Sequence, residues 1–122
     1  MKKLLVVYNP SSGRKRMRKA WHALVRYLPQ DQYATELVPF SNDGPAKNAA
    51  DYTAVVVIGG DGTVRSVVQW LKDQHVTLPI AIIPRGSANL IARSLGVSFS
   101  VRECAQMIKL GKTTAADIGK LD

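Results

Sequence analysis

The sequence predicts a three-layer α/β/α domain with a mainly parallel sheet, and two observations lead to this fold class. Short apolar runs alternate along the chain with segments whose apolar residues recur every three or four positions, as strands and helices do in such domains. In addition, 122 residues with 46% hydrophobic and 21% charged residues suit one domain with one core. We therefore expect residues 1–122 to form a single domain without an internal linker or repeat.

The first half of the chain predicts three strands and two helices. Its first apolar run is nearly continuous, which is the pattern of a strand buried on both faces of a parallel sheet. In the next segment, apolar residues at three- and four-residue spacing define one buried helical stripe before Pro29. The elements expected here are Lys3–Tyr8 (strand), Arg14–Leu28 (helix), Thr35–Phe40 (strand), Pro45–Ala50 (short helix) and Ala54–Ile58 (strand).

The second half continues the alternation of helices and strands. We expect Gly96 and Gly111 to end the last two helices, because glycine is favoured just past a helix C-terminus. The elements expected here are a helix that buries Val64, Val67, Val68 and Leu71, a strand over Pro79–Ile83, a helix that opens at Ser87, a helix over Phe99–Leu110 and a further strand over Thr113–Ile118.

Basic residues outnumber acidic ones, which indicates an anionic partner. The chain has 17 Lys and Arg against 9 Asp and Glu, a formal net charge of +8, and five of the cations lie within residues 14–19. Nucleotide phosphates, an anionic membrane surface or nucleic acid would suit this charge, and a solvated helix face would also explain it. The aromatic residues are scattered, so we do not expect nucleic-acid binding.

The single cysteine, Cys104, excludes a disulfide framework and a cysteine-based metal site within the chain. It falls in an apolar helical pattern with Val101 and Ile108. No apolar run in the sequence comes near the ~20 residues that a membrane span needs. These features favour a reducing, cytoplasmic location, and the basic segment leaves peripheral contact with an anionic membrane open.

Three predicted strands end in loops rich in glycine, serine and asparagine, and such loops meet at the carboxyl edge of an open parallel sheet. In the first, Asn9–Gly13, backbone amides beside glycine and a following helix N-terminus favour phosphate. The third loop, Pro84–Asn89, also joins a buried strand to a helix N-terminus, with Gly86 and Ser87 in place of the serines and glycine of the first. Asn89 and Arg93 lie four residues apart on a helix, so both are candidates to face the crevice. Ordinary turns and a polar helix face would also explain these residues.

The second loop, Gly59–Thr63, carries the most specific signal. Three glycines leave the backbone bare around a single acid, Asp61, directly after a buried strand. Asp61 could organise a magnesium ion through water, hydrogen-bond a ribose or a phosphate-bound water, or take part in proton transfer. We expect Thr63 to cap the next helix and to offer a hydroxyl to phosphate. The alternative is a glycine-rich turn in which Asp61 itself caps the helix.

The order Asn-Pro-x-Ser-Gly, Gly-Gly-Asp-Gly-Thr and Pro-x-Gly-Ser/Thr-x-Asn, at these separations, resembles the catalytic domain of diacylglycerol and sphingosine kinases. The resemblance extends from Tyr8 to Ala116–Gly119 and implies a nucleotide-binding domain like that of NAD kinase, cut off before a second, mostly β domain. It implies that the three loops hold ATP, that Mg²⁺ assists phosphoryl transfer and that a lipid acceptor binds toward the second domain. We expect this chain alone to bind nucleotide with little or no turnover. The face against which the second domain would pack could also form a homodimer.

The resemblance also assigns roles to individual residues. Asp61 is the catalytic candidate, and Asp117, which matches a second acidic position near the phosphates, is the candidate metal ligand. Ser41 matches a hydroxyl position after the second strand. The residues implied in nucleotide contact are Asn9, Pro10, Ser11, Ser12, Gly13, Ser41, Gly60, Asp61, Gly62, Thr63, Val64, Arg65, Ser66 and Ser87.

Two departures from the family pattern keep other functions open. Ser66 stands where the family usually has Glu, and Leu90 where it often has Asp, so magnesium-dependent activity could be weak or absent. One alternative is a small-molecule kinase of the NAD kinase or phosphofructokinase type, although the third loop favours the lipid kinases. Another is a non-catalytic module that binds nucleotide or a membrane surface. Diacylglycerol, a sphingoid base and phosphatidylglycerol all stay open as the lipid acceptor.

Overall fold

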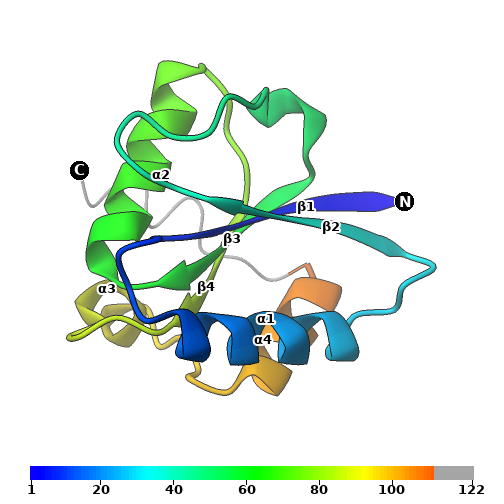
Figure 1. Cartoon of the computed structure of the whole chain (residues 1–122). Helices are drawn as coiled ribbons and strands as arrows, with labels where there is room; N and C mark the ends of the chain where they lie inside the picture. Colours follow the sequence, from blue (N-terminus) through cyan, green and yellow to red (C-terminus); the bar gives the residue numbers. More distant parts are fainter. Residues whose placement is uncertain (112–122) are drawn as a thin grey trace.

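Residues 1–111 are described by the computed structural model, in which a four-stranded sheet lies between two layers of helices (Figure 1). The strand order is β2-β1-β3-β4, and every neighbouring pair is parallel, which confirms the predicted fold class. The elements are β1 (Lys2–Tyr8), α1 (Arg14–Tyr27), β2 (Tyr33–Pro39), the 3₁₀ turn η1 (Ala49–Asp51), β3 (Ala54–Gly59), α2 (Asp61–Asp73), β4 (Ile80–Pro84), α3 (Leu90–Ser94) and α4 (Val101–Lys109).

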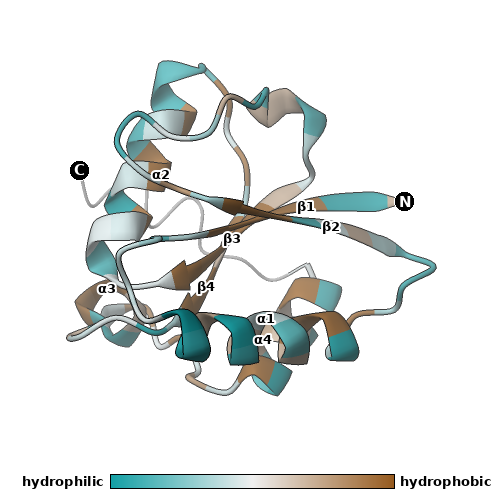
Figure 2. Ribbon diagram, in the orientation of Figure 1, coloured by the Kyte–Doolittle hydropathy of each residue, from teal (hydrophilic) through white to brown (hydrophobic). Residues whose placement is uncertain are grey.

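Side chains of the sheet alternate between two cores, one on each face. Leu4 and Val6 of β1 belong to the core that includes buried residues of α1 and α4, whereas Leu5 and Val7 belong to the core shared with α2 and α3. All of β3 is buried, because helices cover it on both sides. Figure 2 shows this apolar centre, with hydrophilic residues over much of α1. The sheet is therefore the middle of three layers.

The strand register brings the four carboxyl ends to one edge of the sheet. Tyr8 is in register with Pro39 and with Ile58, and Gly59 is in register with Pro84. The connection from β1 to β2 runs through α1 on one face, and the connection from β3 to β4 runs through α2 on the other. The chain thus leaves β1 and β3 in opposite directions, and open parallel sheets bind ligands at such a switch point.

The region around residues 45–50 does not form the predicted helix. Only the single turn η1 forms there, and the Asn48 side chain caps it by accepting a hydrogen bond from the Ala50 amide at 3.1 Å. The side chain of Gln74 accepts from the Ala49 amide at 2.7 Å and donates to the Lys47 carbonyl at 3.0 Å. These bonds satisfy backbone groups that a helix would have paired, and they tie the segment to the end of α2.

Two further boundaries differ from those predicted. The second strand begins at Tyr33 and ends at Pro39. The helix predicted to open at Ser87 begins at Leu90, because Asn89 adopts a left-handed conformation with φ 55° that interrupts the helix. The predicted strand Thr113–Ile118 lies outside the described residues.

Cys104 is buried on α4, as its helical pattern indicated. Its Sγ lies 3.2 Å from the Ser98 carbonyl oxygen, and burial raises the pKa of the thiol to about 11. The thiol is therefore protonated at neutral pH and is a poor nucleophile. Among the helices of residues 1–111, none is long and apolar enough to cross a membrane.

Gly60 and Gly86 touch through their backbones and join the second loop to the third. A Cβ placed on Gly60 would lie 2.9 Å from the Gly86 Cα, and a Cβ placed on Gly86 would lie 2.4 Å from the Gly60 Cα. Both contacts are with backbone, which has little freedom to move. Only glycine at both positions allows the two loops to lie this close.

Gly86→Ala should therefore reduce the free energy of unfolding by about 1–3 kcal/mol, the usual range for an overpacked site. The matched control is Gly62→Ala, because Gly62 lies in α2 and a methyl group placed on its Cα would meet no atom within 4 Å beyond its chain neighbours and the backbone of its own helix. Alanine there should be neutral or stabilising by up to about 1 kcal/mol, since it is the better helix former. Urea unfolding of the two variants measures this difference, and equal stabilities would contradict the close approach.

Candidate functional site

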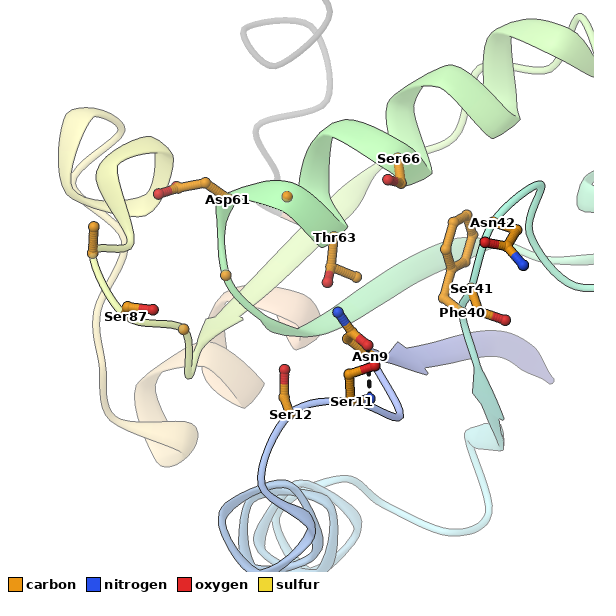
Figure 3. A pocket seen from close by; sticks show the side chains of 14 residues that line it. Asn9, Ser11, Ser12, Phe40, Ser41, Asn42, Asp61, Thr63, Ser66 and Ser87 are labelled. Atoms are coloured by element: carbon orange, nitrogen blue, oxygen red, sulfur yellow. Dashed lines mark hydrogen bonds between the residues drawn. The ribbon is translucent and has the colours of Figure 1, made fainter.

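A cleft of about 540 Å³ opens at the carboxyl edge of the sheet (Figure 3). Segments that follow all four strands contribute to it. The lining residues are Asn9, Ser11, Ser12, Phe40, Ser41, Asn42, Gly60, Asp61, Gly62, Thr63, Ser66, Gly86, Ser87 and Ala88. Most of them are small or carry a hydroxyl or an amide, so the cleft offers many hydrogen-bonding groups and little bulk.

The loop after β1 is a tight turn held by Asn9. The Asn9 side chain accepts a hydrogen bond from the Ser11 amide at 2.8 Å, and the Asn9 carbonyl accepts from the Ser12 amide at 3.0 Å. The turn places Ser11 and Ser12 on the wall of the cleft (Figure 3). α1 begins directly afterwards, with Gly13 as its N-cap and no side-chain cap. Serine hydroxyls and the positive end of a helix therefore lie close together.

Asp61 begins α2 and holds the start of α3. Its Oδ2 accepts a hydrogen bond from the Leu90 amide and its Oδ1 accepts from the Ile91 amide, both at 2.8 Å. The carboxylate thus caps a helix 29 residues away in the chain, which the sequence did not reveal. Thr63 does not cap α2 as predicted, because α2 already begins at Asp61 and Gly60 occupies the N-cap without a side-chain bond. Thr63 is instead a largely buried residue in the wall of the cleft.

The side chain of Asn89 closes the third loop by bonding to its backbone. The Asn89 side chain accepts from the Gly86 amide at 2.8 Å and donates to the Gly86 carbonyl at 3.0 Å, so its amide is used within the loop. Arg93 donates from Nε to the Ala88 carbonyl at 3.1 Å and stacks over the Phe99 ring. Neither of these two candidates lines the cleft, so the alternative left open for them, a turn and a polar helix face, is the one that the structure has. The closed loop exposes Ser87 on the cleft wall.

The segment after β2 forms the side of the cleft opposite Ser87 (Figure 3). Phe40 is buried and packs edge-on against Trp70, with ring centroids 5.9 Å apart. The Gly44 amide donates to the Ser41 carbonyl at 2.9 Å and closes a turn over that indole ring. These contacts hold Ser41 and Asn42 at the mouth of the cleft.

Most residues that the resemblance placed at a nucleotide line the cleft, but four do not. Val64 is buried in the core beneath α2, and its amide donates to the Gly60 carbonyl. Arg65 is exposed on α2, and Pro10 is exposed on the first loop. Gly13 lines a smaller adjoining cavity with Asn9 and Ser12. Val64 and Arg65 follow Thr63 in the motif, but α2 turns their side chains away from the cleft, because successive side chains of a helix point in different directions.

Phe40, Asn42, Gly86 and Ala88 line the cleft and were missing from the predicted contacts. All four flank predicted residues at the carboxyl ends of β2 and β4. Gly86 and Ala88 lie in the third loop, Pro84–Asn89, which the sequence placed at the carboxyl edge of the sheet, and the same rule applied after β2 leads to Phe40 and Asn42.

Among the described residues, Asp61 is the one ionisable side chain in the lining of the cleft. Within residues 1–111, no three His, Cys, Asp or Glu side chains gather into a group able to hold a metal ion. The other predicted acid, Asp117, lies outside the described residues. Each Asp61 oxygen accepts one amide hydrogen bond, and a carboxylate has about four lone-pair sites, so both oxygens can still accept from water.

The sequence and the fold of the chain are similar to those of known proteins. The chain is 28% identical over 123 residues to a diacylglycerol kinase of Staphylococcus haemolyticus, covering 96% of this chain and 37% of that protein. It is 29% identical over 129 residues to a diacylglycerol kinase of Bacillus subtilis, covering all of this chain and 43% of that protein. The chain thus spans about two-fifths of the length of these relatives.

Solved structures give the same result. A crystal structure of a diacylglycerol kinase from Bacillus anthracis matches with a TM-score of 0.69 and 27% identity, over 90% of this chain and 40% of that one. The diacylglycerol kinase catalytic domain matches the sequence over residues 3–121, nearly the whole chain. This protein therefore belongs to the diacylglycerol kinase catalytic domain family.

Proposed function

We propose that the cleft binds ATP with Mg²⁺, and that the chain is the nucleotide-binding part of a lipid kinase that transfers the γ-phosphate of ATP to a lipid hydroxyl. The observation that carries the proposal is the meeting of three serine- and glycine-rich loops at the switch point of a parallel sheet. Membership of the family supports the reaction class. It also favours a lipid acceptor over the soluble acceptors of NAD kinase and phosphofructokinase.

The cleft suits a polyphosphate bound through hydrogen bonds. Ser11, Ser12, Thr63 and Ser87 bring hydroxyls to its walls, and the glycines leave backbone amides accessible. No lysine or arginine within residues 1–111 lines it. Helix N-termini and the metal ion that accompanies ATP would neutralise phosphate charge in such a cleft.

The residues present fit a magnesium ion bound mainly through the nucleotide. Mg²⁺ retains several waters and commonly takes one or two carboxylates together with substrate phosphates. Asp61 retains lone pairs that can accept hydrogen bonds from metal-bound waters. When bound, the ion would neutralise charge on the transferring phosphoryl group. Asp61 itself would position that hydration shell while holding α3 in place.

The described part of this chain supplies positioning groups but no evident base for a lipid hydroxyl other than Asp61. That carboxylate is already engaged by two amides of α3. Ser66 lines the cleft without a carboxylate, and Leu90 is exposed beside Asp61. We infer that the acceptor binds to parts of a longer protein, since the relatives are more than twice as long. The chain alone should bind ATP without phosphorylating a lipid.

A second candidate is a nucleotide-binding module without catalysis, and the residues at positions 66 and 90 favour it. Both candidates bind ATP in the same cleft. They differ in whether a longer protein that contains this chain phosphorylates a lipid. Phosphorylation of diacylglycerol vesicles by a chain extended to the length of the relatives supports the kinase. Its absence, with ATP binding intact, supports the module.

ATP should bind the chain, and Ser12→Ala and Ser87→Ala should each weaken binding about tenfold, because a hydrogen bond to a charged group contributes about 1.5 kcal/mol. Ser94→Ala is the matched control, since Ser94 is an exposed serine at the end of α3 outside the cleft. Calorimetric titration of the three variants measures the affinities. Absence of ATP binding by the intact, folded chain would sink the proposal, and equal loss in all three variants would place the site elsewhere.

Asp61→Asn should have two separable effects. The amide cannot accept both backbone hydrogen bonds, so the free energy of unfolding should fall by about 1.5–3 kcal/mol. Magnesium should increase ATP affinity less than it does in the parent chain, because the acceptor for its hydration shell is weakened. Titrations with and without Mg²⁺, under conditions where the variant is folded, distinguish the roles. If affinity changes by the same factor in both titrations, Asp61 only holds α3.

A further inference from the structure

A second hollow lies on the face of the sheet covered by α1 and α4, away from the nucleotide cleft. The two helices run side by side in Figure 1 and pack against each other. The hollow between them has a volume of about 350 Å³. Its lining residues are Arg16, Lys19, Ala20, Ala23, Arg85 and Val101. None of these residues lines the nucleotide cleft.

Three cations line this hollow. Arg16 and Lys19 project from adjacent positions on one stripe of α1, and Arg85 follows β4. Within the described part of the chain, no carboxylate lines the hollow, and none of the three cations forms an ion pair. A solvated basic face explains Arg16 and Lys19 alone. Arg85 lines the same hollow from another element, at the end of β4.

Arg85 is half-buried and held in position. Its Nη1 donates to the Pro84 carbonyl at 2.7 Å and to the Phe99 carbonyl at 3.1 Å. Burial lowers the pKa of this guanidinium, and the nearby charge of Arg16 lowers it further, although arginine stays protonated at neutral pH. The bonds leave Nη2 and Nε available on a fixed planar group, the arrangement that recognises phosphate oxygens.

We propose that Arg16, Lys19 and Arg85 form a binding site for a phosphate monoester, separate from the nucleotide cleft. A monoester carries about −1.5 to −2 charges at pH 7, which three cations match better than they match a singly charged diester or carboxylate. Ala20, Ala23 and Val101 give the hollow an apolar floor for the carbon part of the ligand. The monoester could be a soluble metabolite or the headgroup of a lipid, and both share this chemistry.

The site adjoins the first nucleotide loop without being part of it. Arg16 and Arg85 also border a smaller cavity whose other walls include Asn9, Ser12 and Gly13. A ligand held between the two arginines would lie behind the turn that presents Ser11 and Ser12. The site does not depend on the proposed function, because none of its residues lines the cleft that we assign to ATP.

Two double variants of α1 test the site. Arg16→Gln with Lys19→Gln removes two lining cations, and Lys15→Gln with Arg18→Gln removes the same charge from exposed positions on a neighbouring stripe. Calorimetric titration with glycerol 3-phosphate should show binding that the first pair weakens about tenfold or more and the second pair by less than about twofold. Circular dichroism and urea unfolding of both variants check that they fold.

Two experiments distinguish a soluble phosphate monoester from a lipid headgroup. In the first, glycerol 3-phosphate is titrated with and without saturating ATP; in the second, the chain is sedimented with phosphatidylcholine vesicles that contain either phosphatidic acid or phosphatidylglycerol. Binding of glycerol 3-phosphate that survives ATP and is lost in the Arg16–Lys19 variant supports a site for the phosphate group itself. Binding only to phosphatidic acid vesicles, lost in the same variant, supports a lipid headgroup.

Three results would overturn the proposal. Equal weakening by both double variants would mean that the general charge of α1 attracts anions. Displacement of glycerol 3-phosphate by ATP, without an effect of the Arg16–Lys19 variant, would place the monoester in the nucleotide cleft. Absence of binding in both experiments would leave no site. The two double variants remove the same charge, so their ATP affinities should be equal to each other, which keeps this test apart from that of the nucleotide cleft.

Discussion

The contact between the backbones of Gly60 and Gly86 sets the geometry on which the cleft depends. It brings the loop after β3 against the loop after β4 at a distance that no side chain permits. Asp61 then reaches across this junction and binds two amides at the start of α3. The loops after the two neighbouring strands therefore behave as one unit, and the wall from Gly60 to Ala88 keeps a defined shape. A preorganised wall is what phosphoryl transfer mainly asks of a protein.

Among the described residues, the cations lie away from the cleft, and the groups that line the cleft are mostly hydrogen-bonding ones. Hydroxyls, amides and glycines line the cleft, whereas cations gather on α1 and beside it, on the face covered by α4. A nucleotide in the cleft would be recognised by directed hydrogen bonds and would bring its own metal ion. The net charge of +8 would act instead on anions at the helical face and over longer range. Two anion-binding regions with different chemistry can thus share one small domain.

The alternation of elements and the three loops could be predicted because their signals are local. Buried strands, helical stripes and glycines after strands are each read within a few residues. Contacts between distant segments could not be predicted in this way. Asp61 was expected to serve its own helix or a ligand, but its partners lie 29 and 30 residues further on. Likewise, the Asn89 side chain bonds to the Gly86 amide, and α3 begins only at Leu90. Ser12, Thr63 and Ser87 reach the cleft because strand ends position them, which the pattern did indicate.

The measurement that tests the nucleotide site most directly is amide chemical-shift mapping of the isotopically labelled chain as ATP and Mg²⁺ are added. We expect the largest shifts at Ser11–Gly13, Gly60–Thr63 and Gly86–Ser87, with smaller shifts at Leu90 and Ile91 transmitted through Asp61. Amides of α4 and of the second half of α1 should not move. Shifts centred on Arg16, Lys19 and Arg85, with the three loops unchanged, would contradict the assignment of the cleft to ATP.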